Sequence, residues 1–139
     1  MDVVVGYKNA EQDRGAVEHA GDECRRAGGA LHLVSYVDFD ALHPQSVDAA
    51  TSRAKRLRGE LEDLAEEVRA GGPACTPHFV SEPGRNASDV VLAVAEEVGA
   101  RLIVVSVRRR SRVGKAFLGS SAQDILLRAD VPVLAVNAD

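Results

Sequence analysis

Five short apolar runs alternate along the chain with longer segments of helical periodicity, and this alternation constrains the fold more than any other feature. The runs are Val3 to Val5, Leu31 to Val37, His78 to Val80, Leu102 to Val107 and Val131 to Val136. Most are rich in β-branched residues and show little polar alternation, which is typical of strands covered on both faces. Alternating strands and helices with short connections favour right-handed crossovers and a parallel sheet. The sequence therefore predicts a Rossmann-like α/β fold, a doubly wound five-stranded parallel sheet in a single domain over residues 1–139.

Four segments between the runs have apolar residues at helical spacing, and their ends carry start and stop signals. The first ends at Gly28 and the second, which is the longest, ends at Gly71. Asn86 followed three residues later by Asp89 predicts the capped start of the third helix. The fourth helix is expected to open near Gly119.

Length and composition limit the classes of function that the chain can serve. Its 139 residues suit one domain with one site, and an aromatic content of only 4% requires a core of Val, Leu, Ile and Ala. A formal net charge of -4 does not favour binding to nucleic acid or to an anionic membrane. No apolar run approaches twenty residues and no secretory leader is recognisable, so we expect a cytoplasmic protein.

The cysteines and histidines are expected to carry no chemistry. Cys24 and Cys75 lie far apart in sequence and outside any CxxC spacing. Two buried thiols are therefore expected, with a structural disulfide as the alternative. No metal site is predicted, because the four histidines occur singly and without ligand spacing: His19, His32, His43 and His78.

The segment after the fourth run contains an unusual concentration of positive charge. Five cations fall within ten residues of a net-acidic chain: Arg108, Arg109, Arg110, Arg112 and Lys115. An anion that bridges several guanidinium groups would relieve their mutual repulsion and would gain charge-assisted hydrogen bonds. The segment therefore predicts an anion-binding site, with a solvated basic loop as the alternative.

A second anion-binding feature follows directly. Gly119, Ser120 and Ser121 open a helix, whose free N–H groups and positive dipole end favour an anion. Both features follow the carboxyl end of a strand, where doubly wound sheets bind their ligands. The alternative for the serines is an ordinary helix cap.

Two other basic features are weighed against this site. The stretch Arg53 to Arg58 is followed on the same helix by the acidic stretch Glu60 to Glu67, which predicts a solvated face with intrahelical ion pairs. Arg85 lies in another strand-to-helix loop and is a candidate for a further cation in the same crevice.

Several of these segments together resemble the universal stress protein family. They are the opening strand with Gly6, the strand Leu31 to Val37, the Asn86 to Val98 helix leading into Gly99 to Val105, and the Gly119-Ser120 turn before Val131 to Val136. The resemblance covers nearly the whole chain and implies an adenine-nucleotide-hydrolase-like fold. It also implies a stress-linked, non-enzymatic role and a homodimer joined through the C-terminal strands, which agrees with an apolar strand at a sheet edge.

The sequence departs from the family's ATP-binding pattern, Gly-x-x-Gly, nine further residues, then Gly and Ser or Thr. Counting back from Gly119 places Ser106 and Arg109 at the first two glycine positions, where glycine would let the backbone approach the phosphates. Lys8 stands where the family has an acidic residue that contacts the nucleoside, and the backbone near Val37 corresponds to groups facing the adenine. The resemblance thus implies weak binding of ATP or another adenine nucleotide, and a different phosphorylated or carboxylated ligand is an equal alternative.

The leading hypothesis is a small non-enzymatic regulator that binds a nucleotide or other phosphate-type anion. The alternative is a ligand-free interaction module that docks an acidic partner through the arginine segment. A slow ATP hydrolase ranks third, since no catalytic signature is visible. The candidate ligand-binding residues are Lys8, Val37, Ser106, Arg108, Arg109, Arg110, Arg112, Lys115, Gly119, Ser120 and Ser121.

Overall fold

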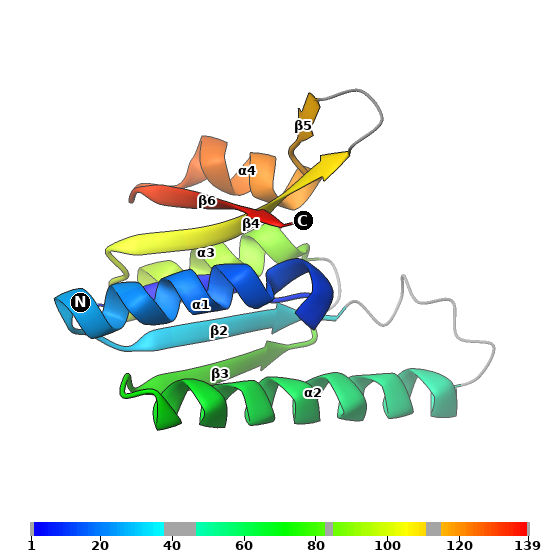
Figure 1. Ribbon diagram of the computed structural model, residues 1–139. Helices are drawn as coiled ribbons and strands as arrows, with labels where there is room; N and C mark the ends of the chain where they lie inside the picture. The colour runs from blue at the N-terminus through cyan, green and yellow to red at the C-terminus, as the bar shows by residue number, and fades with distance from the viewer. Residues whose placement is uncertain (1, 38–46, 83–84, 111–114, 139) are drawn as a thin grey trace.

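A computed structural model describes residues 2–37, 47–82, 85–110 and 115–138. Helices and strands alternate along nearly all of it (Figure 1). The elements are β1 (Val3–Gly6), α1 (Ala10–Ala27), β2 (Leu31–Tyr36), α2 (Val47–Ala70), β3 (Cys75–Val80), α3 (Ala87–Val98), β4 (Leu102–Arg110), β5 (Lys115–Phe117), α4 (Ser120–Arg128) and β6 (Val133–Ala138). The predicted α/β class is confirmed.

The five long strands form one parallel sheet, as predicted. Its order is β3-β2-β1-β4, and β6 pairs with β4 in parallel. Val3 lies in register with Leu31 of β2 and with Leu102 of β4. The chain therefore winds from β1 toward β3 in one direction and from β4 toward β6 in the other. The reversal lies between β1 and β4, where doubly wound sheets form their ligand crevice.

The basic segment after the fourth strand differs from the loop predicted for it. β4 continues to Arg110 and pairs antiparallel with β5, so that Arg110 lies in register with Lys115. The part of the segment that the structure describes is a β-hairpin that projects beyond the other strands (Figure 1). Its cations are therefore carried on paired strands.

Helices cover both faces of the sheet. α1 and α2 contribute Val17 and Leu61 to an apolar cluster on one face, and α3 and α4 contribute Val90 and Ile125 to the cluster on the other. Burial on both faces explains why the strand sequences are apolar at nearly every position. Cys24 and Cys75 are free, buried thiols, as expected.

Local capping signals fix the ends of two helices. The side chain of Asn9 accepts a hydrogen bond from the Gln12 N–H at the start of α1. Asn86 and Asp89 form a reciprocal capping box at the start of α3, which confirms the predicted cap. Gly99 ends α3 in the left-handed conformation, at φ 62°, that glycine adopts without strain.

Candidate anion-binding site

A cleft of about 900 Å³ lies at the carboxyl ends of β1, β2 and β4. Residues of the β1–α1 turn, of α2 and of the α4 start line it together with the strand ends. It spans the winding reversal between β1 and β4, the position expected for a ligand in this fold. The cleft is therefore the strongest candidate for a functional site in the described part of the chain.

A smaller groove of about 130 Å³ between α1 and α2 is a weaker candidate. Its cations are already neutralised by carboxylates: Arg14 lies 3.3 Å from Glu67, and Arg25 pairs with Asp22. A groove whose charges are satisfied internally offers little to an ionic ligand.

The first turn of α4 carries backbone donors without a side-chain cap. Gly119 is the N-cap residue, at φ -61° and ψ 158°, and no side-chain cap hydrogen bond is formed. The alternative, an ordinary serine cap, is therefore wrong: Ser120 and Ser121 are the first helical residues, and both line the cleft. The N–H groups of an uncapped first turn, together with the helix dipole, form a binding position for an anion.

Ser106 supplies a second, independent feature of this end of the cleft. It lies on β4, lines the cleft, and is 9% exposed. Its Oγ is buried without a hydrogen-bond partner among the described residues. A buried hydroxyl with no partner costs about 1–3 kcal/mol. A ligand oxygen in the cleft would remove that cost.

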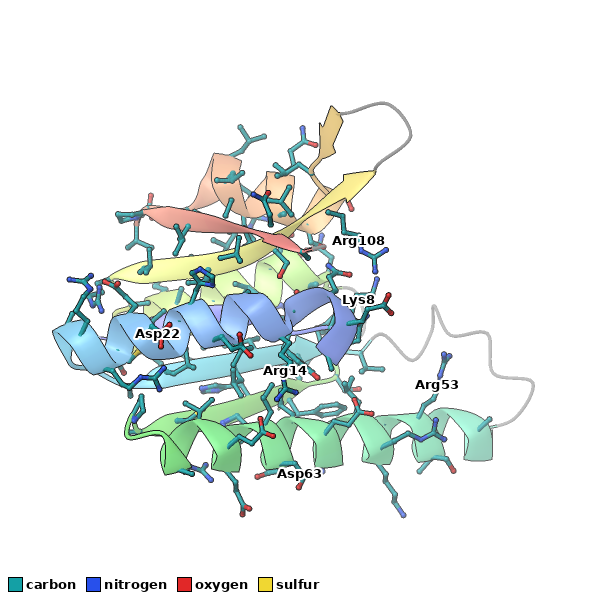
Figure 2. The ribbon with its side chains drawn as sticks, viewed as in Figure 1. Lys8, Arg14, Asp22, Arg53, Asp63 and Arg108 are labelled. Carbon is teal, nitrogen blue, oxygen red and sulfur yellow. The ribbon has the colours of Figure 1, made fainter. Side chains whose placement is uncertain are left out.

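Lys8 follows β1 and Arg108 lies on β4, the two strands that flank the winding reversal. Both are exposed and line the cleft, and Figure 2 shows them at the same end of the sheet. The Lys8 N–H donates to Asp13 Oδ2 at 2.6 Å, so this buried carboxylate holds the β1–α1 turn that presents Lys8. Neither Lys8 nor Arg108 forms an ion pair with another described residue.

Two arginines of α2 that the sequence does not place at the site also line the cleft. The sequence predicts a solvated, internally paired helix face for Arg53 and Arg56, but among the described residues neither has an ion-pair partner. Other arginines in the described ranges do have carboxylate partners; they are Arg14, Arg25, Arg26, Arg85, Arg101 and Arg128. The cleft thus gathers cations that nearby carboxylates leave unpaired.

An apolar wall lies beside this charged end. Val34, Tyr36 and Val37 at the end of β2 line the cleft together with Leu57 of α2. The Val37 N–H donates to the carbonyl of Val80 at 3.1 Å, so this donor already serves the sheet. The wall offers apolar surface of the kind against which a nucleobase packs.

The other cations predicted for the site are not seen to line the cleft. Arg109 and Arg110 lie on β4 and Lys115 on β5, but their side chains fall outside the described residues, as does the whole of Arg112. Arg85 does not line the cleft. Its guanidinium lies 3.0 Å from Glu82 and also donates to the carbonyl of Asp89.

Comparisons with known proteins agree with this fold and with the resemblance noted in the sequence. Residues 1–137 match the model of the universal stress protein family. A universal stress protein of Mycolicibacterium smegmatis is 35% identical over 136 residues, which cover 97% of this chain and 96% of that protein.

Solved structures of universal stress proteins have the same fold as this chain. A universal stress protein from Archaeoglobus fulgidus superposes with a TM-score of 0.80 at 26% identity, covering 98% of both chains. A structure of the universal stress protein from the same organism in complex with dAMP superposes with a TM-score of 0.71 at 24% identity, covering 98% of this chain and 97% of that one.

Proposed function

The chain belongs to the universal stress protein family, and we propose that it is a small, non-enzymatic regulator that binds a nucleotide or another phosphate-type anion in the cleft at β1 and β4. One observation carries this proposal. The uncapped first turn of α4 and the unpartnered hydroxyl of Ser106 line the same cleft, and each lacks the partner that a phosphate oxygen would supply.

The arrangement suggests how a nucleotide would lie. Its phosphate accepts hydrogen bonds from the first turn of α4 and from Ser106, and Arg108 neutralises its charge. Its base packs against the apolar wall of Val34, Tyr36 and Val37. The dAMP complex of a protein with the same fold supports an adenine nucleotide as the first ligand to test.

Binding of ATP is expected to be weak. Ser106 and Arg109 carry side chains where two glycines would let the backbone approach a triphosphate closely. Cation side chains replace some of those contacts, but from a greater distance than a backbone N–H.

A homodimer and a cytoplasmic location belong to the same proposal. β6 pairs with β4 along one edge, and its other edge has no partner strand in the described part of the chain. Two free, buried thiols fit a reducing compartment. Among the described residues, no helix has the length and apolar character needed to cross a membrane.

The second candidate function is an interaction module, and the β4–β5 hairpin favours it. The hairpin projects beyond the other strands (Figure 1) and carries Arg108 to Arg110 and Lys115. An acidic partner surface would be complementary to such a hairpin.

Calorimetric titration with ADP tests the leading function. We expect saturable one-to-one binding to the natural chain and about tenfold weaker binding to Arg108→Gln, because a charge-assisted hydrogen bond is lost. Lys55→Gln is the matched control, since Lys55 is an exposed cation outside the cleft. Absence of heat with ADP, AMP and inorganic phosphate alike would favour the interaction module.

A further inference from the structure

The cations of the cleft form two groups on different elements. Lys8 lies in the β1–α1 turn and Arg108 on β4, near the α4 start, whereas Arg53 and Arg56 lie on α2. In Figure 2 the labelled side chains of Lys8, Arg53 and Arg108 all lie at the same end of the molecule. Two cation groups facing one cleft suggest a ligand with more than one anionic group.

The separation of the two groups follows from the sheet order. α2 packs on β3 and β2, while α4 follows β4, and β1 lies between β2 and β4. Neighbouring strands are about 4.8 Å apart, so β2 and β4 are about 10 Å apart. An anion held at the α4 start therefore lies on the far side of β1 from the α2 arginines.

The balance of charge in the cleft leaves the α2 arginines available. Among the described residues, two carboxylates also line the cleft, Asp13 and Glu60. Asp13 is 3% exposed and accepts the Lys8 N–H, so it is occupied by the turn. Glu60 lies one turn after Arg56 on α2, but the two form no ion pair. One carboxylate cannot neutralise both arginines and Lys8.

Other cations of α2 lie outside the cleft. Arg58 lies over the ring of Phe79, at 4.7 Å from its centroid, and does not line the cleft. Lys55 is exposed and also lies outside the cleft. Arg53 and Arg56 therefore differ from Lys55 and Arg58 in position, because they line the cleft, and not in charge.

We infer that this cleft selects a nucleotide with phosphates at both ends of its ribose, one on the 5′ oxygen and one on the 2′ or 3′ oxygen. This inference rests on the proposed function. The 5′ phosphate binds at Ser106 and the α4 start, the ribose lies over the β1–α1 turn beside Lys8, and the second phosphate meets Arg53 and Arg56. Guanidinium groups suit this contact because they bind phosphate through paired hydrogen bonds.

A 5′-diphosphate, which has the same number of phosphate groups, would satisfy the site less well. It places both phosphates at the α4 end and leaves the α2 arginines without an anion. A bisphosphate also carries more negative charge than ADP. The contribution of α2 is therefore measured by how substitutions on α2 change the difference in affinity between the two ligands.

Calorimetric titration with adenosine 3′,5′-bisphosphate, adenosine 2′,5′-bisphosphate and ADP at one salt concentration tests the inference. We expect one bisphosphate to bind the natural chain about tenfold more tightly than ADP does. In Arg53→Gln/Arg56→Gln the ratio should fall to about one, because the bisphosphate loses the contact of its second phosphate and ADP has no such contact to lose. Lys55→Gln, which removes one charge from the same helix outside the cleft, should keep the ratio of the natural chain.

The outcomes distinguish the proposed nucleotide site from its proposed selectivity. If ADP and both bisphosphates bind the natural chain equally, the selectivity inference is overturned and the nucleotide site stands. If none of the three binds, both are overturned. Each variant is first checked by circular dichroism, and the single variant Arg56→Gln replaces the double variant if the latter is unfolded. A ratio that the α2 substitutions leave intact also overturns the inference.

Discussion

The ring nitrogens Nδ1 of His32 and Nε2 of His78 lie 2.8 Å apart and share a hydrogen bond. The other nitrogen of His32, Nε2, lies 2.8 Å from Asp2 Oδ2, and Asp2 Oδ1 accepts the Ala30 N–H at 3.1 Å. A hydrogen bond between two imidazoles requires a proton on one nitrogen and a lone pair on the other. The pair therefore keeps its bond only while at least one of the two rings is neutral.

This pair predicts that stability falls in mild acid. Burial lowers the pKa of His78, the nearby His32 lowers it further, and Glu97 opposes this shift. The unfolded chain, with an ordinary histidine pKa of about 6.5, then binds more protons than the folded one as pH falls. The stability present above about pH 6.5 is thus lost as pH drops through the folded pKa. Chemical denaturation at pH 7 and pH 5 measures the loss.

Two substitutions separate this pair from general acid effects. His78→Gln retains a donor for His32 but cannot titrate, so its stability should fall less between pH 7 and pH 5. His19→Gln removes an exposed histidine of α1 and should behave like the natural chain. An equal loss in His78→Gln and in the natural chain would assign the pH dependence to other groups. Asp2, whose pKa is held low mainly by its hydrogen bond with His32, adds to the loss only at lower pH.

The histidine pair also shows where sequence reasoning ends. His32 and His78 are 46 residues apart, and they meet because β2 and β3 are parallel with Val34 opposite His78. Strand and helix positions could be predicted, since apolar periodicity and the Asn86 cap are local signals. The register between two strands is not a local signal. The spacing of the histidines along the chain therefore does not reveal which of them meet.

The same limit applies to the candidate site. Gly119 and Ser106 could be placed at the cleft because they end or follow a predicted strand. Arg53 and Arg56 could not, because helical periodicity gives the polar side of α2 but not which part of that side faces another element. The extension of β4 to Arg110 was missed because a run of arginines lacks the apolar character by which strands are recognised.

Ser106→Ala should have opposite effects on stability and on binding. Removing the unpartnered buried hydroxyl should raise the free energy of unfolding of the ligand-free chain by about 1 kcal/mol, while ADP affinity falls. Urea denaturation and calorimetry measure the two quantities.

Ser35→Ala is the matched control for that substitution. Ser35 is also buried on a strand, but its Oγ donates to the carbonyl of Tyr7 at 2.7 Å. Its removal should therefore lower stability by about 1 kcal/mol or more. If both variants lose stability equally, Ser106 has a partner in solution and the argument for a ligand oxygen there is lost.

The two thiols should be unreactive in the folded chain. Burial raises the pKa of Cys75 to about 11 and also raises that of Cys24. Because the thiolate is the reactive species, modification by a disulfide reagent at pH 7 should be slow and limited by unfolding. In denaturant both thiols should react at once. Rapid modification of the native chain would show that one thiol is accessible.

The edge of β6 should join two copies of the chain. Leu134 on β6 is 40% exposed and Leu127 on α4 is 78% exposed, although both are large and apolar. An edge strand with unpaired backbone groups and exposed leucines is a surface that natural proteins usually cover. Sedimentation velocity at tens of micromolar, on the order of the dissociation constant of a moderate interface, should therefore show a dimer.

Leu134→Arg should shift this equilibrium to the monomer, because a buried charge without a partner is strongly unfavourable at the centre of an interface. Leu134 is partly exposed in the single chain, so the arginine can reach solvent there and circular dichroism should show the native helix content. Ala74→Arg is the control, since Ala74 is exposed just before β3, at the opposite edge of the sheet. It should leave the dimer intact. A natural chain that sediments as a monomer would contradict the predicted dimer. A dimer that Ala74→Arg disrupts and Leu134→Arg does not would place the contact away from β6.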